Sequence, residues 1–297
     1  MASDLLELPD GRQAQVWHGG IATGPLVMYL HGTPDSRLTA RTGDAAAVRA
    51  GVHLVGVNRP GYGRSDPAES GLGSVADDTV AVADSLGVFR FAVLGASGGG
   101  PYALACAVRH PDRVAAVGVV AGPGVLPELD PPTQTDEEPT DGQRRLAAHL
   151  AAGEDEAAVE LLSSDLRDLA DRVLGDDDLE VVARWCEGLP AADTELLTSL
   201  PPGAVAAGVR ESLASPVGYV RDGLATFGAW EIRPEDVRCP TWLWYGAADP
   251  VVPPRHGQWL AQRVPGSNLV VREDTAHLES LLLHWEDMLG TLRDAVG

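Results

Sequence analysis

Short apolar runs separated by polar or glycine-rich turns recur near both ends of the chain and predict buried strands. Between these runs lie longer segments rich in alanine and leucine, a composition typical of helices. The predicted strands are Pro25–Leu30, Val52–Val57, Phe91–Leu94, Val114–Val120, Pro240–Tyr245 and Asn268–Val271; the helices between them are Arg37–Ala50, Val75–Leu86, Pro101–Arg109 and Arg255–Arg263. Strands that alternate with helices predict an α/β fold with a mostly parallel central sheet and helices on both faces.

The two ends of the chain add a hairpin and a helix to this core. Leu5–Leu8 and Gln13–Trp17 flank the turn sequence Pro9-Asp10-Gly11, which predicts an opening antiparallel hairpin. A closing amphipathic helix is predicted over Leu278–Ala295.

The alternation of strands and helices stops in the middle of the chain. From Pro123 to Glu235 the sequence has helical segments and no convincing strand. We therefore expect an α/β core formed by residues 1–122 and 236–297, with a helical insertion at residues 123–235. Within the insertion, Leu126–Asp141 is rich in proline and acidic residues and is predicted to be a mobile loop or hinge.

Charge narrows the range of partners. The net charge is −21, and the insertion alone carries 24 acidic residues against 8 arginines. Such a balance argues against nucleic acid and anionic membranes as partners, so we expect a small-molecule substrate. No apolar stretch approaches the roughly 18 residues of a spanning helix, and the first residues do not resemble a signal peptide. These features favour a cytoplasmic protein; nothing in the sequence indicates its oligomeric state.

Cysteine usage gives no indication of a disulfide framework or a metal site. The three cysteines, Cys106, Cys186 and Cys239, are widely separated and odd in number. We expect neither a metal nor a cofactor.

The most informative stretch joins a predicted strand to a predicted helix. Gly95-Ala96-Ser97-Gly98-Gly99 is a G-x-S-x-G sequence, in which a sharp turn holds the serine above the sheet. The flanking residues must be small, because a larger side chain would collide with the strand or the helix. Taken alone, the sequence also fits a glycine-rich turn or a phosphate cradle at a helix start.

Polar residues follow several of the predicted strands, at the edge of the sheet where ligands bind in open parallel sheets. They are His31–Thr33, Ser97, Asp249 and His277. Serine, acid and histidine occur in the order Ser–Asp–His, the order expected for a catalytic triad on this architecture.

Together these motifs resemble the α/β-hydrolase fold family with a helical cap. The resemblance rests on HGTP at 31–34, RPGYGRSD at 59–66, GASGGG at 95–100, GAADPVVP at 246–253 and a histidine after the last strand, and it covers essentially the whole chain. It implies that Ser97 is the nucleophile, His277 the general base and then acid, and Asp249 the partner that orients the imidazole. The implied oxyanion hole uses the backbone N–H groups of Gly98 and Thr33, since Pro34 has none.

Other readings of these residues are open at this stage. Asp249 also suits a turn ahead of Pro250, and His256 and His284 are further histidines inside predicted helices. His31 is expected to brace the loop rather than transfer protons. Arg59 and Asp66 suggest an ion pair that holds the loop between them.

The reaction class follows from the nucleophile. Relatives on this fold that open epoxides or remove halides use an aspartate nucleophile, and a serine at position 97 argues against both. We expect a serine hydrolase that cleaves a carboxylic ester or lactone of a small, largely apolar substrate through an acyl-enzyme. The alternatives are an aminopeptidase of the proline-iminopeptidase type whose acidic cap binds a free amine, carbon–carbon bond cleavage by a similar triad, and a receptor-like pseudo-hydrolase.

Overall fold

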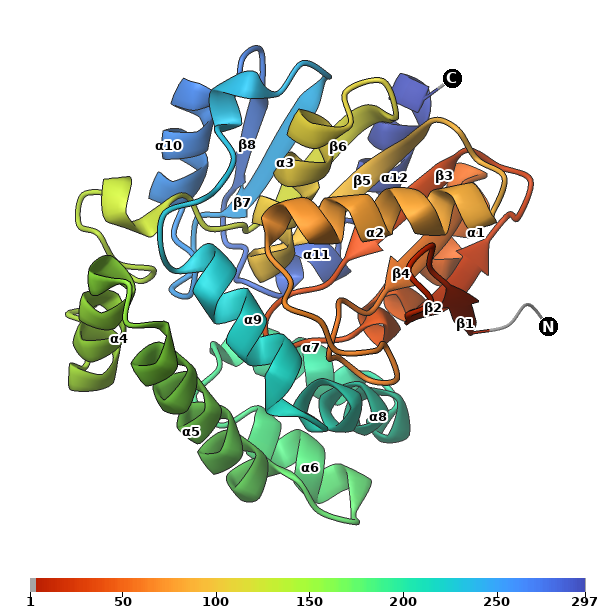
Figure 1. Ribbon diagram of the computed structural model, residues 1–297. Coiled ribbons are helices and arrows are strands. Elements are labelled where there is room, and N and C mark those ends of the chain that lie inside the picture. Colours follow the sequence, from red (N-terminus) through yellow and green to blue (C-terminus); the bar gives the residue numbers. More distant parts are fainter. Residues whose placement is uncertain (1–3, 297) are drawn as a thin grey trace.

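The computed structural model describes residues 4–296, which form one eight-stranded sheet in the order β1-β2-β4-β3-β5-β6-β7-β8 (Figure 1). The strands are β1 (Leu5–Glu7), β2 (Gln13–Gly20), β3 (Leu26–Leu30), β4 (His53–Val57), β5 (Phe91–Ala96), β6 (Val114–Val120), β7 (Thr241–Gly246) and β8 (Asn268–Arg272). β1 pairs antiparallel with β2, and β2 antiparallel with β4, whereas every pair from β4 to β8 is parallel. The predicted hairpin and mostly parallel sheet are confirmed.

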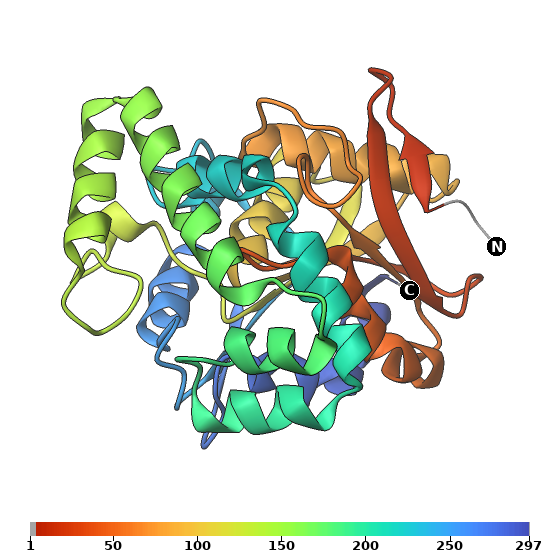
Figure 2. The same cartoon turned by 90° about the horizontal axis from the view of Figure 1, so that it is seen from below.

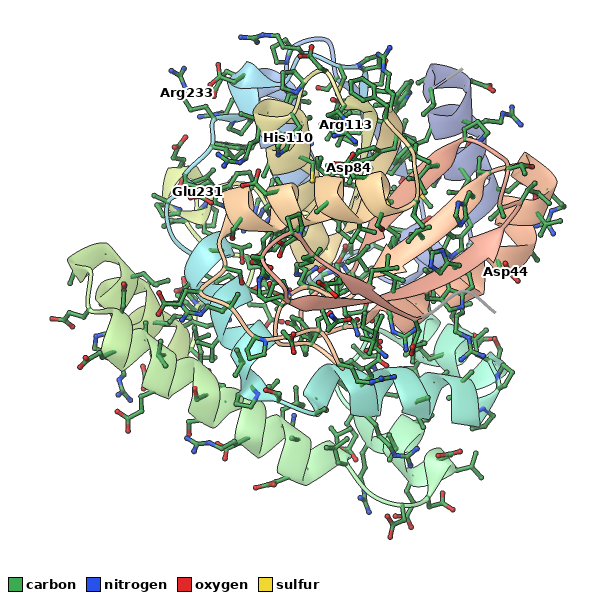
Figure 3. All side chains as sticks on the ribbon, turned by 45° about the vertical axis from the view of Figure 1, so that its right-hand side comes forward. Asp44, Asp84, His110, Arg113, Glu231 and Arg233 are labelled. Carbon is green, nitrogen blue, oxygen red and sulfur yellow. The ribbon has the colours of Figure 1, made fainter. Side chains whose placement is uncertain are left out.

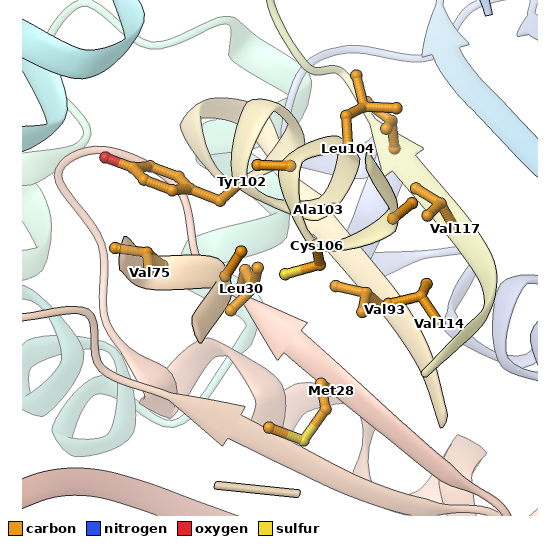
Figure 4. Close-up of a cluster of buried hydrophobic side chains, with 14 of the residues drawn as sticks. Met28, Leu30, Val75, Val93, Tyr102, Ala103, Leu104, Cys106, Val114 and Val117 are labelled. Carbon is orange, nitrogen blue, oxygen red and sulfur yellow. The ribbon is translucent and has the colours of Figure 1, made fainter. Parts of the chain in front are cut away.

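Helices cover both faces of the sheet, because the central strands are apolar on both sides. On one face, α2 (Leu72–Ser85), α3 (Gly100–Arg109) and α10 (Arg255–Arg263) bury side chains against the strands. Figure 4 shows part of this layer, where Leu104 and Cys106 of α3 lie over Val93 and Val117 of the sheet.

The opposite face is covered by two helices from distant parts of the chain. α1 (Asp44–Ala50) and α12 (Trp285–Val296) pack together there and bury Trp285, Met288 and Leu292. The closing helix is shorter than predicted, because Leu283 and His284 interrupt it and separate α11 (Glu279–Leu282) from α12.

Six α-helices and no strand lie between β6 and β7. They are α4 (Asp141–Ala152), α5 (Asp155–Val173), α6 (Asp178–Trp185), α7 (Ala191–Ser199), α8 (Pro202–Leu213) and α9 (Pro216–Thr226). They have apolar clusters of their own, and Figures 1 and 2 show them gathered at one end of the sheet. We call residues 123–235 the cap; these limits remain the sequence-based prediction.

Charged side chains on the cap helices extend outward (Figure 3). Most acidic residues of these helices are exposed to water; Asp193 and Asp222 are buried. No helix in residues 4–296 is both long and apolar enough to cross a membrane.

The proline-rich segment, predicted to be a mobile loop or hinge, is hydrogen-bonded to the start of α10. The guanidinium of Arg255 donates to the backbone oxygens of Thr133 and Thr135 at 2.6 and 2.9 Å and pairs with Asp136 at 2.7 Å. Buried His256 donates from Nε2 to the backbone oxygen of Gln134 at 2.7 Å. Sequence composition could not reveal these contacts, because they depend on residues about 120 positions away.

Candidate active site

Ser97 stands at the junction between β5 and α3, in the left-handed region of backbone space with φ 49°. Such a conformation is strained for a non-glycine residue, and its presence at a sharp turn is a feature of nucleophile elbows. The neighbouring glycines are required by close backbone contacts. A Cβ at Gly95 would lie 2.3 Å from the oxygen of Gly99, and one at Gly99 would lie 2.1 Å from the oxygen of Leu30.

Asp249 and His277 come from the loops after β7 and β8, and their side chains meet. Oδ2 of Asp249 lies 2.7 Å from Nδ1 of His277. The other carboxylate oxygen accepts the backbone N–H groups of Val251 and Val252 at 2.8 and 3.0 Å. These bonds fix the carboxylate, which is buried. A carboxylate at Nδ1 holds the imidazole with a proton on that nitrogen and leaves Nε2 free to accept one.

Ser97 and His277 line the same cavity, of about 550 Å³. Among the hydrogen bonds of residues 4–296, none joins these two side chains. In ligand-free enzymes, catalytic hydrogen bonds are often long and tighten only when substrate binds. The structure thus brings the three predicted side chains to one site, with the acid–histidine pair already bonded.

The two amides predicted for the oxyanion hole are neighbours. A Cβ built at Gly98 would lie 3.4 Å from the backbone nitrogen of Thr33 and 2.5 Å from its Oγ1. Both residues flank Ser97 in space, because β3 and β5 are adjacent parallel strands that end at the same edge of the sheet. The backbone nitrogens of Gly98 and Thr33 therefore lie close together beside Ser97.

The predicted ion pair between Arg59 and Asp66 is wrong. Asp66 accepts the backbone N–H of Gln13 at 2.8 Å, whereas the buried guanidinium of Arg59 pairs with Asp222 of α9 at 2.5 Å. The sequence alone could not identify this partner, because Asp222 lies 163 residues further along the chain, on a cap helix.

His31 braces the loop after β3, as the sequence predicted. Burial, and then the nearby charge of Arg59, hold the pKa of His31 well below its usual range, so the ring is neutral. Its Nδ1–H donates to the oxygen of Gly32 at 2.8 Å, and its Nε2 accepts the backbone N–H of Arg59 at 3.3 Å. Both ring nitrogens of His31 are thus engaged in hydrogen bonds with the backbone.

The cap contributes a mainly apolar wall to the cavity. Its larger apolar side chains are Trp185, Leu189, Leu197, Leu200, Val205 and Val209. An apolar wall of this kind favours the acyl or alcohol part of a hydrophobic substrate.

Asp193 of α7 is an exception among these cap residues, and the sequence analysis missed it. It lines the cavity, is fully buried, and its Oδ1 accepts the backbone N–H groups of Leu278 and Glu279 at 3.0 and 3.1 Å. Its Oδ2 is buried without a hydrogen-bond partner in the described structure. Burial raises the pKa of this carboxyl above its ordinary value of 3.8. Acidic residues are common in the first turn of helices, so the sequence does not indicate that Asp193 is buried beside the cavity.

The other candidate histidines have different surroundings. His256 is buried in α10, where Nδ1 accepts the backbone N–H of Gly124 at 3.1 Å and burial lowers its pKa to about 4. His284 lies between α11 and α12 and does not line the cavity. Within residues 4–296, no group of three or more His, Cys, Asp or Glu side chains has an arrangement that could hold a metal ion.

Comparisons with known proteins identify the fold family. The model of a family described as "alpha/beta hydrolase fold" matches residues 25–282. The chain is 29% identical over 278 residues to the pimeloyl-[acyl-carrier protein] methyl ester esterase of Chromobacterium violaceum, a match that spans 92% of this chain and 95% of that protein. It is also 37% identical over 111 residues to epoxide hydrolase B of Mycobacterium tuberculosis, which is 35% of this chain and 31% of that protein.

Solved structures show the same fold at lower sequence identity. The enol-lactonase of Burkholderia xenovorans LB400 superposes with a TM-score of 0.68 over 98% of each chain, at 17% identity.

Proposed function

This chain belongs to the alpha/beta hydrolase fold family, and from that premise we propose that it is a serine hydrolase that cleaves a carboxylic ester or lactone through an acyl-enzyme on Ser97. The observation that carries the proposal is the bonded pair of Asp249 and His277, in which His277 lines the same cavity as the strained Ser97. A serine hydroxyl is a weak nucleophile, and a neighbouring base is what activates it.

In the first half of the proposed reaction, Nε2 of His277 takes the hydroxyl proton while Oγ of Ser97 attacks the ester carbonyl carbon. The carbonyl π electrons move to oxygen, and the resulting oxyanion accepts hydrogen bonds from the N–H groups of Gly98 and Thr33. The tetrahedral intermediate then collapses: the C–O bond to the alcohol breaks, and the imidazolium returns its proton to the leaving oxygen.

In the second half, water replaces the alcohol. His277 takes a proton from water as its oxygen attacks the acyl carbon, and the collapse breaks the bond to Oγ and returns the proton to Ser97. Asp249 stays ionised throughout and stabilises the imidazolium. With a lactone the released alcohol is part of the same molecule, so the product is a hydroxy acid.

The cavity supports a small, largely apolar substrate. Leucine, valine and tryptophan side chains of the cap form its outer wall, and burying an alkyl chain there releases roughly 25 cal/mol per Å² of apolar surface. The names of the relatives include a methyl ester esterase and an enol-lactonase, both of which act on acyl–oxygen bonds. The match to epoxide hydrolases does not favour epoxide opening here, because position 97 is a serine and not a carboxylate.

One observation favours an aminopeptidase as the second candidate. The unpartnered Oδ2 of Asp193 belongs to a cap acid that lines the cavity, and a substrate ammonium is one group that would satisfy it. This candidate predicts cleavage of prolyl amides and a strong loss of that activity in Asp193→Asn.

The test is a comparison of purified wild-type and Ser97→Ala protein on p-nitrophenyl esters from acetate to octanoate, on lactones, and on prolyl p-nitroanilide. We expect Ser97-dependent turnover of esters or lactones and none of the anilide. Turnover of the anilide alone, lost in Asp193→Asn, would establish the aminopeptidase instead. No turnover of any of the three classes, or equal turnover by Ser97→Ala, would overturn the proposed function.

A further inference from the structure

The carboxylate of Asp222, on cap helix α9, collects hydrogen bonds from four core residues. Thr33 Oγ1 donates to it at 2.6 Å, Tyr62 at 2.7 Å, Tyr102 at 2.8 Å and Arg59 Nε at 2.9 Å. A second guanidinium nitrogen of Arg59 completes the set. The mechanism proposed above assigns no role to Asp222, yet it forms a buried ion pair between the cap and the catalytic core.

The pair is buried, with side-chain exposure of 2% for Arg59 and 3% for Asp222. Burial alone lowers the pKa of Arg59, but the adjacent carboxylate outweighs it and holds the pKa above its ordinary value, so the guanidinium is charged. An uncompensated charge at this depth is strongly unfavourable. The buried charge of Arg59 is therefore compensated by the carboxylate of Asp222 from the cap.

The position of α9 is set by close packing at a glycine. A Cβ at Gly218 would lie 2.3 Å from the ring of Tyr62, so the helix backbone rests directly on this core side chain. The ring of Tyr102 lies at the edge of the buried cluster in Figure 4, with its hydroxyl pointing out of the cluster; that hydroxyl is the one that reaches Asp222. Close packing at Gly218 and the hydrogen bond from Tyr102 to Asp222 thus hold α9 against the core.

Arg59 connects Asp222 to the oxyanion loop, by which we mean residues His31–Thr33. Its Nη1 donates to the oxygen of His31, and its Nη2 donates to the oxygen of Gly32 at 2.8 Å and to Oγ1 of Thr33 at 3.0 Å. The Gly32–Thr33 peptide bond is trans, and in a trans peptide the C=O and N–H groups point in opposite directions. Holding the oxygen of Gly32 therefore fixes the direction of the Thr33 N–H.

We propose that Asp222 is a positioning residue through which cap helix α9, acting by way of Arg59 and the hydroxyl of Thr33, aims the Thr33 N–H into the oxyanion hole. The inference rests on the proposed function, since it assigns a role in stabilising the oxyanion. In this proposal both cap and core form the oxyanion hole. The nucleophile, base and acid belong to the core, but the direction of the Thr33 N–H depends on the carboxylate of Asp222 in the cap.

The central test is Asp222→Asn, which keeps the size of the side chain and removes its charge. Complete loss of one oxyanion donor lowers kcat by about 10²–10³-fold, which bounds the effect of misalignment. We expect kcat and kcat/KM for the best ester to fall together by about 10- to 100-fold, with KM changed by less than about 2-fold, because an oxyanion contact is made only in the transition state. Loss of the cap wall alone would instead raise KM.

A matched pair at position 33 keeps the proposal testable if Asp222→Asn does not fold. Thr33→Val has the same shape as threonine but removes the hydroxyl that joins Asp222 and Arg59; Thr33→Ser keeps the hydroxyl. Both retain the backbone N–H. We expect kcat of the valine variant to be about 10-fold lower than kcat of the serine variant.

Tyr102→Phe is the control for an unspecific effect on the network. It removes one hydrogen bond from the same carboxylate but none from the oxyanion loop. We expect this variant to lose thermal stability and to keep kcat within about 2-fold.

A trifluoromethyl ketone inhibitor separates an effect on the oxyanion hole from an effect on stability alone. Ser97 adds to its carbonyl carbon, and the carbonyl oxygen then lies in the oxyanion hole as an oxyanion. Across wild type and the four variants, its inhibition constant should rise in proportion to the loss of kcat/KM. Retained inhibitor affinity in Asp222→Asn and Thr33→Val, or equal kcat values for Thr33→Val and Thr33→Ser, would overturn the proposal. Absence of Ser97-dependent turnover in wild type would instead refute the proposed function, which separates the two failures.

Discussion

Asp249 and His277 form a hydrogen bond of 2.7 Å across two loops that follow the last two strands of the sheet. The geometry around Asp249 makes its amide analogue a sharp test. Two backbone N–H groups hold Oδ1, so an asparagine would keep its oxygen there and turn its NH₂ group toward His277. The imidazole would then have to accept at Nδ1 and carry its proton on Nε2, where it cannot act as a base.

We therefore predict that Asp249→Asn lowers kcat about 10⁴-fold while the protein still folds, since the wrong histidine tautomer has an effect of that size in other triads. Steady-state kinetics with the best ester and a thermal unfolding curve check both parts. A reduction smaller than 10-fold would show that the acid–histidine bond is not part of the mechanism.

Asp193 predicts a pH-dependent stability. Burial raises its pKa above 3.8 in the folded protein, so between pH 3.8 and the folded-state pKa the folded state binds more protons than the unfolded state. Stability from this group therefore decreases as pH rises through that interval. Asparagine keeps the acceptor for Leu278 and Glu279 and cannot ionise.

Asp193→Asn should accordingly raise the unfolding temperature at pH 7, and the gain should vanish below about pH 3.8. Thermal unfolding of both proteins from pH 3 to pH 8 makes the comparison. A difference that stays constant with pH would contradict the assignment of a raised pKa to this residue.

Two glycine substitutions, one in the elbow and one at the end of α4, should differ in their effect on activity. Gly99 has φ −77°, which alanine adopts freely, but its Cβ would lie 2.1 Å from the backbone oxygen of Leu30. Gly153 at the end of α4 has φ 69° and nothing within 4 Å of an added Cβ. An alanine at position 99 would clash with the backbone of Leu30, whereas an alanine at position 153 would have to adopt a left-handed backbone conformation.

We predict that Gly99→Ala destabilises the protein by about 1–3 kcal/mol, the range for overpacking, and lowers kcat strongly because Ser97 must shift. Gly153→Ala should cost about 1–2 kcal/mol, the penalty for a left-handed alanine, with kcat unchanged. Chemical unfolding and ester kinetics on both variants give the result; full activity in Gly99→Ala would mean that the elbow tolerates displacement.

The sequence predicted the sheet and the site loops well, for a physical reason. Buried parallel strands such as β5 and β6 need apolar side chains on both faces, so their sequences stand out as continuous apolar runs. The residues at their carboxyl ends then fall at one edge of the sheet. Ser97, Asp249 and His277 are candidates because each follows a predicted strand; in the structure Asp249 and His277 are hydrogen-bonded, and His277 lines the same cavity as Ser97.

The contacts between cap and core could not be predicted in the same way. Asp222 and Asp193 lie on cap helices whose orientation depends on packing between segments far apart in the sequence. The stretch Tyr219–Phe227 has Arg221 directly beside Asp222, so its pattern does not indicate that Asp222 faces inward. Its partner could not be chosen from sequence, and Arg59 was assigned to the nearby Asp66 instead.

The central claim is that Ser97 is a nucleophile activated within this cavity, and covalent labelling tests it most directly. Wild-type protein is incubated with a p-nitrophenyl alkylphosphonate, and intact mass and peptide sequencing by mass spectrometry locate any adduct. The account predicts one phosphonyl group per chain, on Ser97, with loss of esterase activity in step with labelling and no adduct in Ser97→Ala. Labelling at another residue, or full activity in a protein labelled at Ser97, would contradict it.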